Sequence, residues 1–120
     1  MVAKISQGER ALDKNIEILK NIIVEVVDPD KIILFGSYAY GNPTEKSDAD
    51  FLVLKDGLFF DIEKTGKLIT SIRRRKNAQG VSLRCDLFFD NETNANEVAS
   101  NRGGAYADAL SKGRVVYVRS

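Results

Sequence analysis

Residues 32–53 have the sequence IILFGSYAYGNPTEKSDADFLV, and this stretch decides how the rest of the chain is interpreted. An apolar run ends at Gly36-Ser37, and after ten further residues Asp48-Ala49-Asp50 opens a second apolar run. Each run is short, apolar and bounded by turn-forming residues, which is typical of a buried β-strand. The stretch therefore predicts two core strands joined by a polar connection.

The connection carries signals for a sharp bend followed by a short helical turn. Gly36 permits the bend because it has no side chain. Ser37 is a favourable N-cap, Gly41 is suited to end the turn, and Pro43 prevents its continuation. A helix that starts here directs free backbone N–H groups toward one spot, which attracts phosphate oxygens. Gly36 and Ser37 are therefore expected to contact phosphate.

The second run begins with two carboxylates. Side chains at positions i and i+2 of a strand share one face, so Asp48 and Asp50 can converge from backbone positions about 6–7 Å apart. Converging carboxylates repel each other unless a cation lies between them, and Mg²⁺ prefers such oxygen ligands. Either motif alone commonly marks a solvated loop. Together, in this order, they favour a phosphate site facing a divalent cation, as in phosphoryl or nucleotidyl transfer.

The same residues resemble the signature of a known family. Gly36-Ser37, ten residues and Asp48-x-Asp50 match the minimal nucleotidyltransferases, which are small members of the DNA polymerase β-like nucleotidyltransferase superfamily. The wider pattern Gly-Ser-Tyr-Ala-x-Gly, then Ser-Asp-x-Asp-Phe-Leu-Val, is similar to the same family. The resemblance implies an α/β (α+β) nucleotidyltransferase fold with a small mixed central sheet flanked by helices. One position departs from the pattern, because many members carry Arg or Lys where this chain has Tyr40.

A third strand is predicted over residues 81–89, where apolar and polar side chains alternate. Asp86 lies on the polar side of this alternation. If the strand neighbours the one that carries Asp48 and Asp50, Asp86 can join those carboxylates. The resemblance implies that a third acidic residue on a following strand completes the site. Asp86 is the best match to it, and Asp90 is the second.

Two longer helices are predicted from apolar residues at steps of three and four, one over residues 8–27 and one from Ile62 to the basic cluster Arg73–Lys76. Asp61 is a candidate N-cap for the second. The basic cluster is interpreted as a solvated helix end, where cations interact favourably with the helix dipole. Contact with an acidic partner, RNA or nucleotide phosphates is the alternative.

The last part of the chain consists of a polar segment, residues 91–104, followed by a more apolar one, residues 105–118. Asn91–Gly104 is rich in Asn and Gly, which indicates a flexible loop or a broken helix. A short helix is predicted at residues 105–110, closed by Gly113 in the left-handed conformation. A last strand is predicted at residues 115–118.

Composition limits the class of protein. With 120 residues of which 43% are hydrophobic, the chain is expected to form one domain, residues 1–120. A net charge of +1 argues against a direct nucleic-acid partner. The sequence has no membrane-spanning stretch and no signal peptide, and its single cysteine cannot form an internal disulfide, so a cytoplasmic protein is expected. The absence of histidine excludes His-based triads and histidine zinc sites.

The resemblance implies an enzyme that moves AMP from ATP to a hydroxyl group, with Mg²⁺ as cofactor. Asp48, Asp50 and Asp86 would be the catalytic and metal-binding residues, and Gly36 and Ser37 would bind the nucleotide. Because one small domain leaves no second domain to grip an acceptor, the resemblance implies a protein partner. That partner would be a helical HEPN-domain toxin, modified on a tyrosine, with this chain as its antitoxin in a hetero-oligomer.

Two alternatives stay open at this point. The chain could be a binding module that has lost turnover and neutralises its partner by contact, which Tyr40 favours. It could also be an enzyme with a small-molecule acceptor, such as an aminoglycoside, whose pocket is completed by a homo-oligomer. A nucleic-acid polymerase is disfavoured by the near-neutral charge and the single basic cluster.

Overall fold

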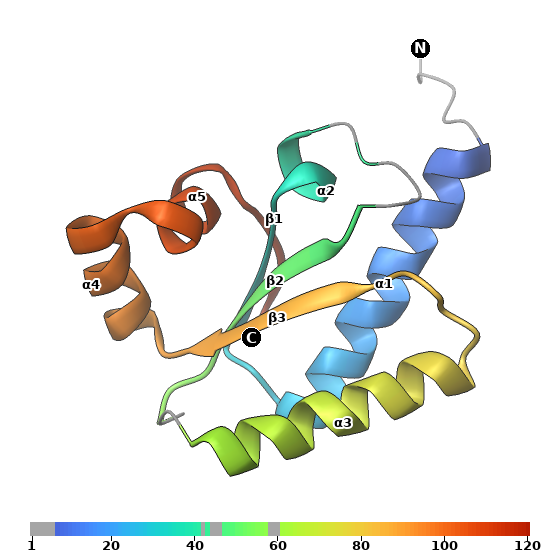
Figure 1. Ribbon diagram of the computed structural model, residues 1–120, viewed down its shortest axis with the longest axis horizontal. Coiled ribbons are helices and arrows are strands. Elements are labelled where there is room, and N and C mark those ends of the chain that lie inside the picture. The colour runs from blue at the N-terminus through green and yellow to red at the C-terminus, as the bar shows by residue number, and fades with distance from the viewer. Residues whose placement is uncertain (1–6, 42, 44–46, 58–60) are drawn as a thin grey trace.

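The computed structural model describes residues 7–41, 43, 47–57 and 61–120, with side chains from residue 14 onward and without that of Tyr40. The elements in chain order are α1 (Gln7–Val27), β1 (Lys31–Phe35), α2 (Ser37–Tyr40), β2 (Ala49–Leu54), α3 (Ile62–Ala78), β3 (Cys85–Asp90), α4 (Glu92–Arg102), α5 (Gly104–Lys112) and β4 (Arg114–Val118) (Figure 1). The predicted α/β fold is confirmed. No helix of the described part is long and apolar enough to cross a membrane.

The four strands form one mixed sheet in the order β3-β2-β1-β4. Strand β1 is antiparallel to both β2 and β4, whereas β2 and β3 are parallel. Parallel neighbours need a crossover connection, and α3 provides it. The mixed sheet agrees with the resemblance, and the parallel pairing brings the amino-terminal ends of β2 and β3 to the same edge.

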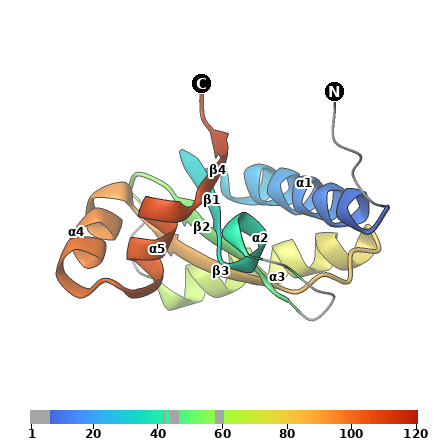
Figure 2. The same cartoon turned by 90° about the horizontal axis from the view of Figure 1, so that it is seen from above.

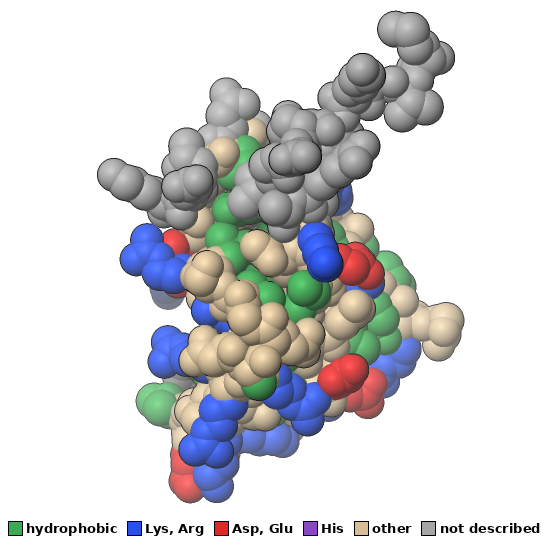
Figure 3. Space-filling model, turned by 90° about the vertical axis from the view of Figure 1, so that its right-hand side faces the viewer, with side chains coloured by type: hydrophobic (Ala, Val, Ile, Leu, Met, Phe, Trp, Pro, Cys, Tyr) green, Lys and Arg blue, Asp and Glu red, His purple; other side chains and the backbone are tan. Residues whose placement is uncertain are grey.

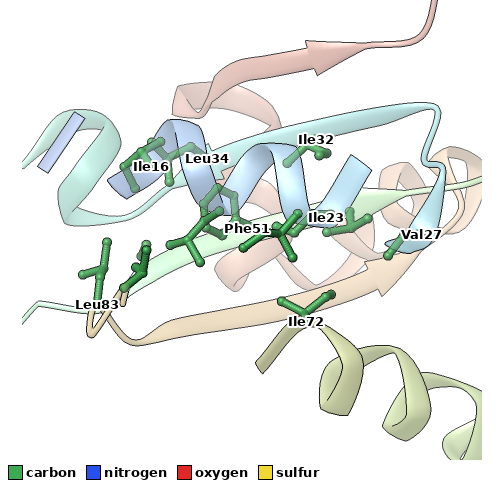
Figure 4. Packing of buried hydrophobic residues seen from close by; sticks show 13 residues of the cluster. Ile16, Ile23, Val27, Ile32, Leu34, Phe51, Ile72 and Leu83 are labelled. Carbon is green, nitrogen blue, oxygen red and sulfur yellow. The ribbon is translucent and has the colours of Figure 1, made fainter. Parts of the chain in front are cut away.

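Each face of the sheet has its own apolar cluster, because successive side chains of a strand point to opposite sides. On one face, Ile32 and Phe51 pack against Leu19 of α1 and Ile72 of α3 (Figure 4). On the other face, Ile33 and Leu52 pack against Ala95 of α4 and Ala109 of α5. Figure 2 shows these two pairs of helices on opposite sides of the strands.

The segment from Asn91 to Gly104 resolves the alternative left open by its composition. It is a helix that breaks at two glycines, and not a loop. The Asn91 side chain accepts a hydrogen bond of 2.8 Å from the Asn94 backbone N–H and so caps α4. The structure thus has one helix more than the sequence pattern predicts.

The predicted left-handed cap at Gly113 is wrong. Its φ of −67° and ψ of 161° are extended values that any residue can adopt. The glycine is needed for another reason, since a Cβ here would overlap the carbonyl oxygen of Ala109 and the Cγ2 of Ile33. Gly113 therefore allows the end of α5 to approach β1 closely.

The basic cluster at the end of α3 is mostly exposed, as expected, and one member connects two helices. Arg75 Nη1 lies 2.9 Å from Glu25 Oε2 of α1. Both side chains are exposed, so the ion pair contributes little to stability. On the face shown in Figure 3, Lys and Arg side chains lie with Asp and Glu side chains among them. The N-cap at the other end of this helix is confirmed, because Asp61 accepts a hydrogen bond from the Lys64 N–H.

Candidate active site

Three of the predicted acidic residues lie together where β2 and β3 begin. Asp50 and Asp86 are register partners in the parallel pair, so their side chains are neighbours on one face of the sheet. Asp48 precedes Asp50 by two positions and its charge acts on it. The structure thus brings Asp86 to the Asp48–Asp50 pair, on the face covered by α4 and α5.

Asp90, the second candidate for the third carboxylate, lies at the far end of β3, opposite Leu54. It accepts hydrogen bonds from the Asn94 side chain at 2.7 Å and from the Tyr106 hydroxyl at 3.2 Å. Burial, and then the Asp90 charge, raise the pKa of Tyr106 to about 12. Asp90 therefore anchors α4 and α5 and is not part of the carboxylate cluster.

The carboxyl groups at the site are crowded. Burial first, and then the charges of Asp86 and Asp48 and a hydrogen bond with Asp86, together raise the pKa of Asp50 from 3.8 to about 6. A carboxylate with a raised pKa is one whose charge is poorly stabilised by its surroundings. The site therefore favours either a proton or a cation between Asp50 and Asp86.

The Gly36 bend faces this cluster. Gly36 has a φ of 76°, a backbone conformation that residues with a side chain rarely adopt. A Cβ at this position would also overlap Asp50 Oδ2. Glycine is thus required both for the bend and for the close approach of the backbone to the carboxylate. The predicted N-cap is wrong by one residue. Gly36 occupies the cap position of α2 without a side-chain hydrogen bond, and Ser37 is the first helical residue.

A basic residue that was not expected also belongs to the site. Arg84 Nε lies 3.0 Å from Asp48 Oδ1, an ion pair in which Arg84 is 73% exposed and Asp48 35%. The Ala49 N–H donates to the Arg84 carbonyl oxygen at 2.9 Å, so the β2–β3 pairing extends back to this residue. The signal for Arg84 is its place two residues before Asp86, but it can be used only once the two strands are known to be parallel.

Two buried polar atoms here make no hydrogen bond with any described residue, the Tyr38 hydroxyl and Asp48 Oδ1. The contact of Asp48 Oδ1 with Arg84 is close enough for an ion pair but lacks hydrogen-bond geometry. Burial, and then the Asp48 charge, raise the pKa of Tyr38. Asp48 Oδ1, although paired with Arg84, therefore retains capacity to accept from or coordinate a further ligand.

The residues present fit a hard divalent cation such as Mg²⁺. No three acidic, Cys or His side chains of the described ranges already stand at metal-ligand spacing. The donors are nevertheless of the required kind, namely three neighbouring carboxylates, a buried Asp48 oxygen without a hydrogen bond, and a crowded Asp50. A cation would stabilise the charged form of Asp50, whose pKa is raised first by burial and then by the charges of Asp86 and Asp48.

Asp86 also borders a cleft of about 180 Å³ between α3 and β3, lined further by Ile69, Ile72, Arg73, Cys85 and Leu87. Burial raises the pKa of the Cys85 thiol, although Lys76 and Arg73 act in the opposite direction. Cys85 packs against the apolar cluster on the α1–α3 face. The cysteine is thus a partly buried packing residue, and Arg73 lines the same cleft as Asp86.

We expect the pKa of Asp50 to be visible in the stability of the metal-free chain. Because the folded-state pKa of about 6 exceeds 3.8, the folded chain binds more protons, and the free energy of unfolding falls as pH rises from about 4 to about 6. Asp50→Asn removes this loss, so the variant should be more stable than wild type at pH 7, by about 1–2 kcal/mol after allowance for partial exposure.

Urea unfolding at pH 4, 5, 6 and 7 with a chelator present measures this effect. Asp108→Asn, an exposed residue on α5, is the control and should follow the wild-type profile. Parallel profiles for Asp50→Asn and wild type would contradict the raised pKa.

The sequence matches the family model described as polymerase beta, nucleotidyltransferase, over residues 17–120. None of the curated proteins matches the sequence significantly. Among solved structures, a candidate nucleotidyltransferase from Sulfolobus solfataricus is similar, with 18% identity, a TM-score of 0.57, and coverage of 97% of this chain and 94% of that one. At this level of sequence identity, the similarity shows a shared fold only.

Two structures of toxin–antitoxin complexes are also similar in part. One is a mutant of the toxin–antitoxin MntA-HpeT, with 20% identity and a TM-score of 0.49. The other is a toxin–antitoxin solved with AMP-PNP, with 22% identity and a TM-score of 0.47. Each match covers 90% of this chain and 73% of the other. Similarity at this level supports no inference about function.

Proposed function

The chain belongs to the polymerase beta nucleotidyltransferase family, whose model matches residues 17–120, and on this premise we propose that it transfers AMP from ATP to a hydroxyl group. One observation supports the proposal most. The Asp50 and Asp86 carboxyl groups are neighbours on parallel strands, and the Gly36 backbone lies against Asp50. This arrangement places the start of α2 next to an acidic cluster.

Asp48, Asp50 and Asp86 are the proposed ligands of a Mg²⁺ ion. When bound, the ion would neutralise negative charge on the phosphates and on the leaving group. Gly36 and Ser37 are proposed to lie against the phosphates of ATP, because α2 begins at Ser37 and its first backbone N–H groups have no partner within the helix. These residues would orient the α-phosphorus for attack.

The proposed reaction is an in-line displacement. The oxygen of the acceptor hydroxyl forms a bond to the α-phosphorus, the bond from that phosphorus to the oxygen bridging to the β-phosphate breaks, and pyrophosphate leaves. The hydroxyl proton passes to a carboxylate. Asp86 is proposed for this step because it is the most exposed of the three and so the most accessible to an acceptor hydroxyl.

The proposed acceptor is a tyrosine of a HEPN-domain toxin, with this chain as its antitoxin. The proposal rests on the resemblance of the Gly36-Ser37 and Asp48-x-Asp50 motifs to the minimal nucleotidyltransferases. The test is co-expression of this chain with a HEPN-domain toxin from the same source, followed by measurement of the intact mass of that toxin. We expect mass increments of one or more AMP groups, absent when the chain carries Asp48→Asn and Asp50→Asn. A partner that is neutralised without any increment would contradict it.

A second candidate is a binding module without turnover. The Asp48–Arg84 ion pair favours it, because Arg84 occupies an oxygen that a cation would need. In the same co-expression test, this candidate expects the doubly substituted chain to neutralise the partner as well as wild type does.

A further inference from the structure

The four charged side chains at the start of β2 and β3 form two rows on one face of the sheet. Asp50 and Asp86 form one row as register partners. Asp48 and Arg84 form the other, one step toward the amino-terminal ends, joined by the 3.0 Å ion pair. Arg84 lies directly before β3 and two positions before Asp86, and its carbonyl oxygen accepts the Ala49 N–H, so the arginine is placed on the face of the proposed metal ligands.

The ion pair between Asp48 and Arg84 is weak enough for a divalent cation to replace it. The Arg84 side chain is 73% exposed, and exposed ion pairs add little to stability. Asp48 is more enclosed, at 35%, and its Oδ1 lacks a hydrogen bond. A divalent cation would therefore displace the Arg84 side chain from Asp48. The released guanidinium group would then lie next to the bound cation.

A nucleotide triphosphate that approaches three carboxylates meets strong repulsion, which a nearby cationic side chain must offset. A guanidinium group suits this role, because its planar set of donors matches two phosphate oxygens at once. Arg73 lines the cleft that Asp86 borders, whereas Arg84 directly contacts a carboxylate of the site, at 3.0 Å from Asp48 Oδ1.

We propose that Arg84 is the phosphate-binding residue of this site, held by Asp48 in the empty protein and transferred to a nucleotide phosphate when a divalent cation takes its place. This rests on the proposed function. It has a consequence for binding order. Metal alone must compete with Arg84 for Asp48, whereas metal with nucleotide also gives the displaced guanidinium group a phosphate to bind, so the two ligands bind cooperatively.

The test compares Arg84→Gln with wild type in two binding measurements. Mn²⁺ alone is titrated by electron paramagnetic resonance, and ATP with Mg²⁺ is titrated by calorimetry. We expect Arg84→Gln to bind Mn²⁺ alone several-fold more tightly, because the competitor for Asp48 is gone, and to bind ATP with Mg²⁺ at least tenfold more weakly. Arg84→Lys should recover part of the ATP affinity. A merely structural role would weaken both.

Arg75→Gln is the matched control, because Arg75 is also an exposed arginine in an ion pair and lies away from the carboxylates. It should leave both titrations at wild-type values. If wild type binds ATP with Mg²⁺ and Arg84→Gln binds both ligands equally well, or loses affinity for both, the role of Arg84 is overturned and the proposed function stands. If wild type binds no ATP with Mg²⁺, the proposed function itself is overturned, and Arg84 has no nucleotide to contact.

Discussion

Replacement of Asp48 and Asp50 together by Asn is expected to reduce AMP transfer to the partner by about a thousandfold or more. The reason is that both proposed metal ligands of β2 lose their charge while their size is preserved. Loss of a single preorganised electrostatic contact to a transition state commonly costs a factor of about 10²–10³. Two such losses at one site should leave no measurable turnover. Pyrophosphate release from ATP in the purified complex with the partner measures this.

The change should not act through unfolding. Asn at position 50 removes a crowded carboxylate, so the doubly substituted chain should be at least as stable as wild type at pH 7. Asp108→Asn makes the same chemical change on an exposed part of α5 and should retain full activity. Wild-type pyrophosphate release from the doubly substituted chain, at unchanged stability, would refute the proposed catalytic site.

Gly36→Ala is the second change with a large expected effect. Alanine at φ of 76° costs about 1 kcal/mol, and its Cβ would overlap Asp50 Oδ2. The Asp50 carboxylate must then move, or the bend must open. A displacement of about 1 Å at a reacting centre can reduce the rate by a factor of about 10². We therefore expect a loss of about a hundredfold in AMP transfer and a stability loss of about 1–3 kcal/mol.

The chain provides a control that separates backbone strain from the steric effect. Gly57 has nearly the same φ, 75°, but among the described residues a Cβ there would meet no atom within 4 Å. Gly57→Ala should therefore lose about 1 kcal/mol of stability in urea unfolding and keep its activity. Equal losses of activity in the two variants would contradict the proposed contact between the bend and Asp50.

The core of the site could be predicted from the sequence because its signals are local. Gly36 and the apolar runs on either side of the motif define the bend and two strands within a short stretch. Alternation over the third strand places Asp86 on the face away from Leu83 and Cys85, and the structure agrees. In each case the side-chain period of a strand carries the information.

The other features of the site depend on how elements distant in the sequence pack together, and a local sequence pattern does not predict that packing. Strand direction is one example, since only the parallel pairing of β2 and β3 aligns Arg84 with Asp48. The choice between Asp86 and Asp90 is another, because it depends on which end of β3 meets Asp50. Gly113 is a third, since its small size is required by β1 and not by its own conformation.

The most direct test of the proposed site is a crystal structure of the chain with Mn²⁺ and a nonhydrolysable ATP analogue, in which anomalous scattering locates the metal. We expect the Mn²⁺ ion between Asp48, Asp50 and Asp86, with the phosphates against the Gly36 bend and Arg84 released from Asp48. Mn²⁺ bound elsewhere, with the Asp48–Arg84 ion pair intact in the presence of the analogue, would contradict it.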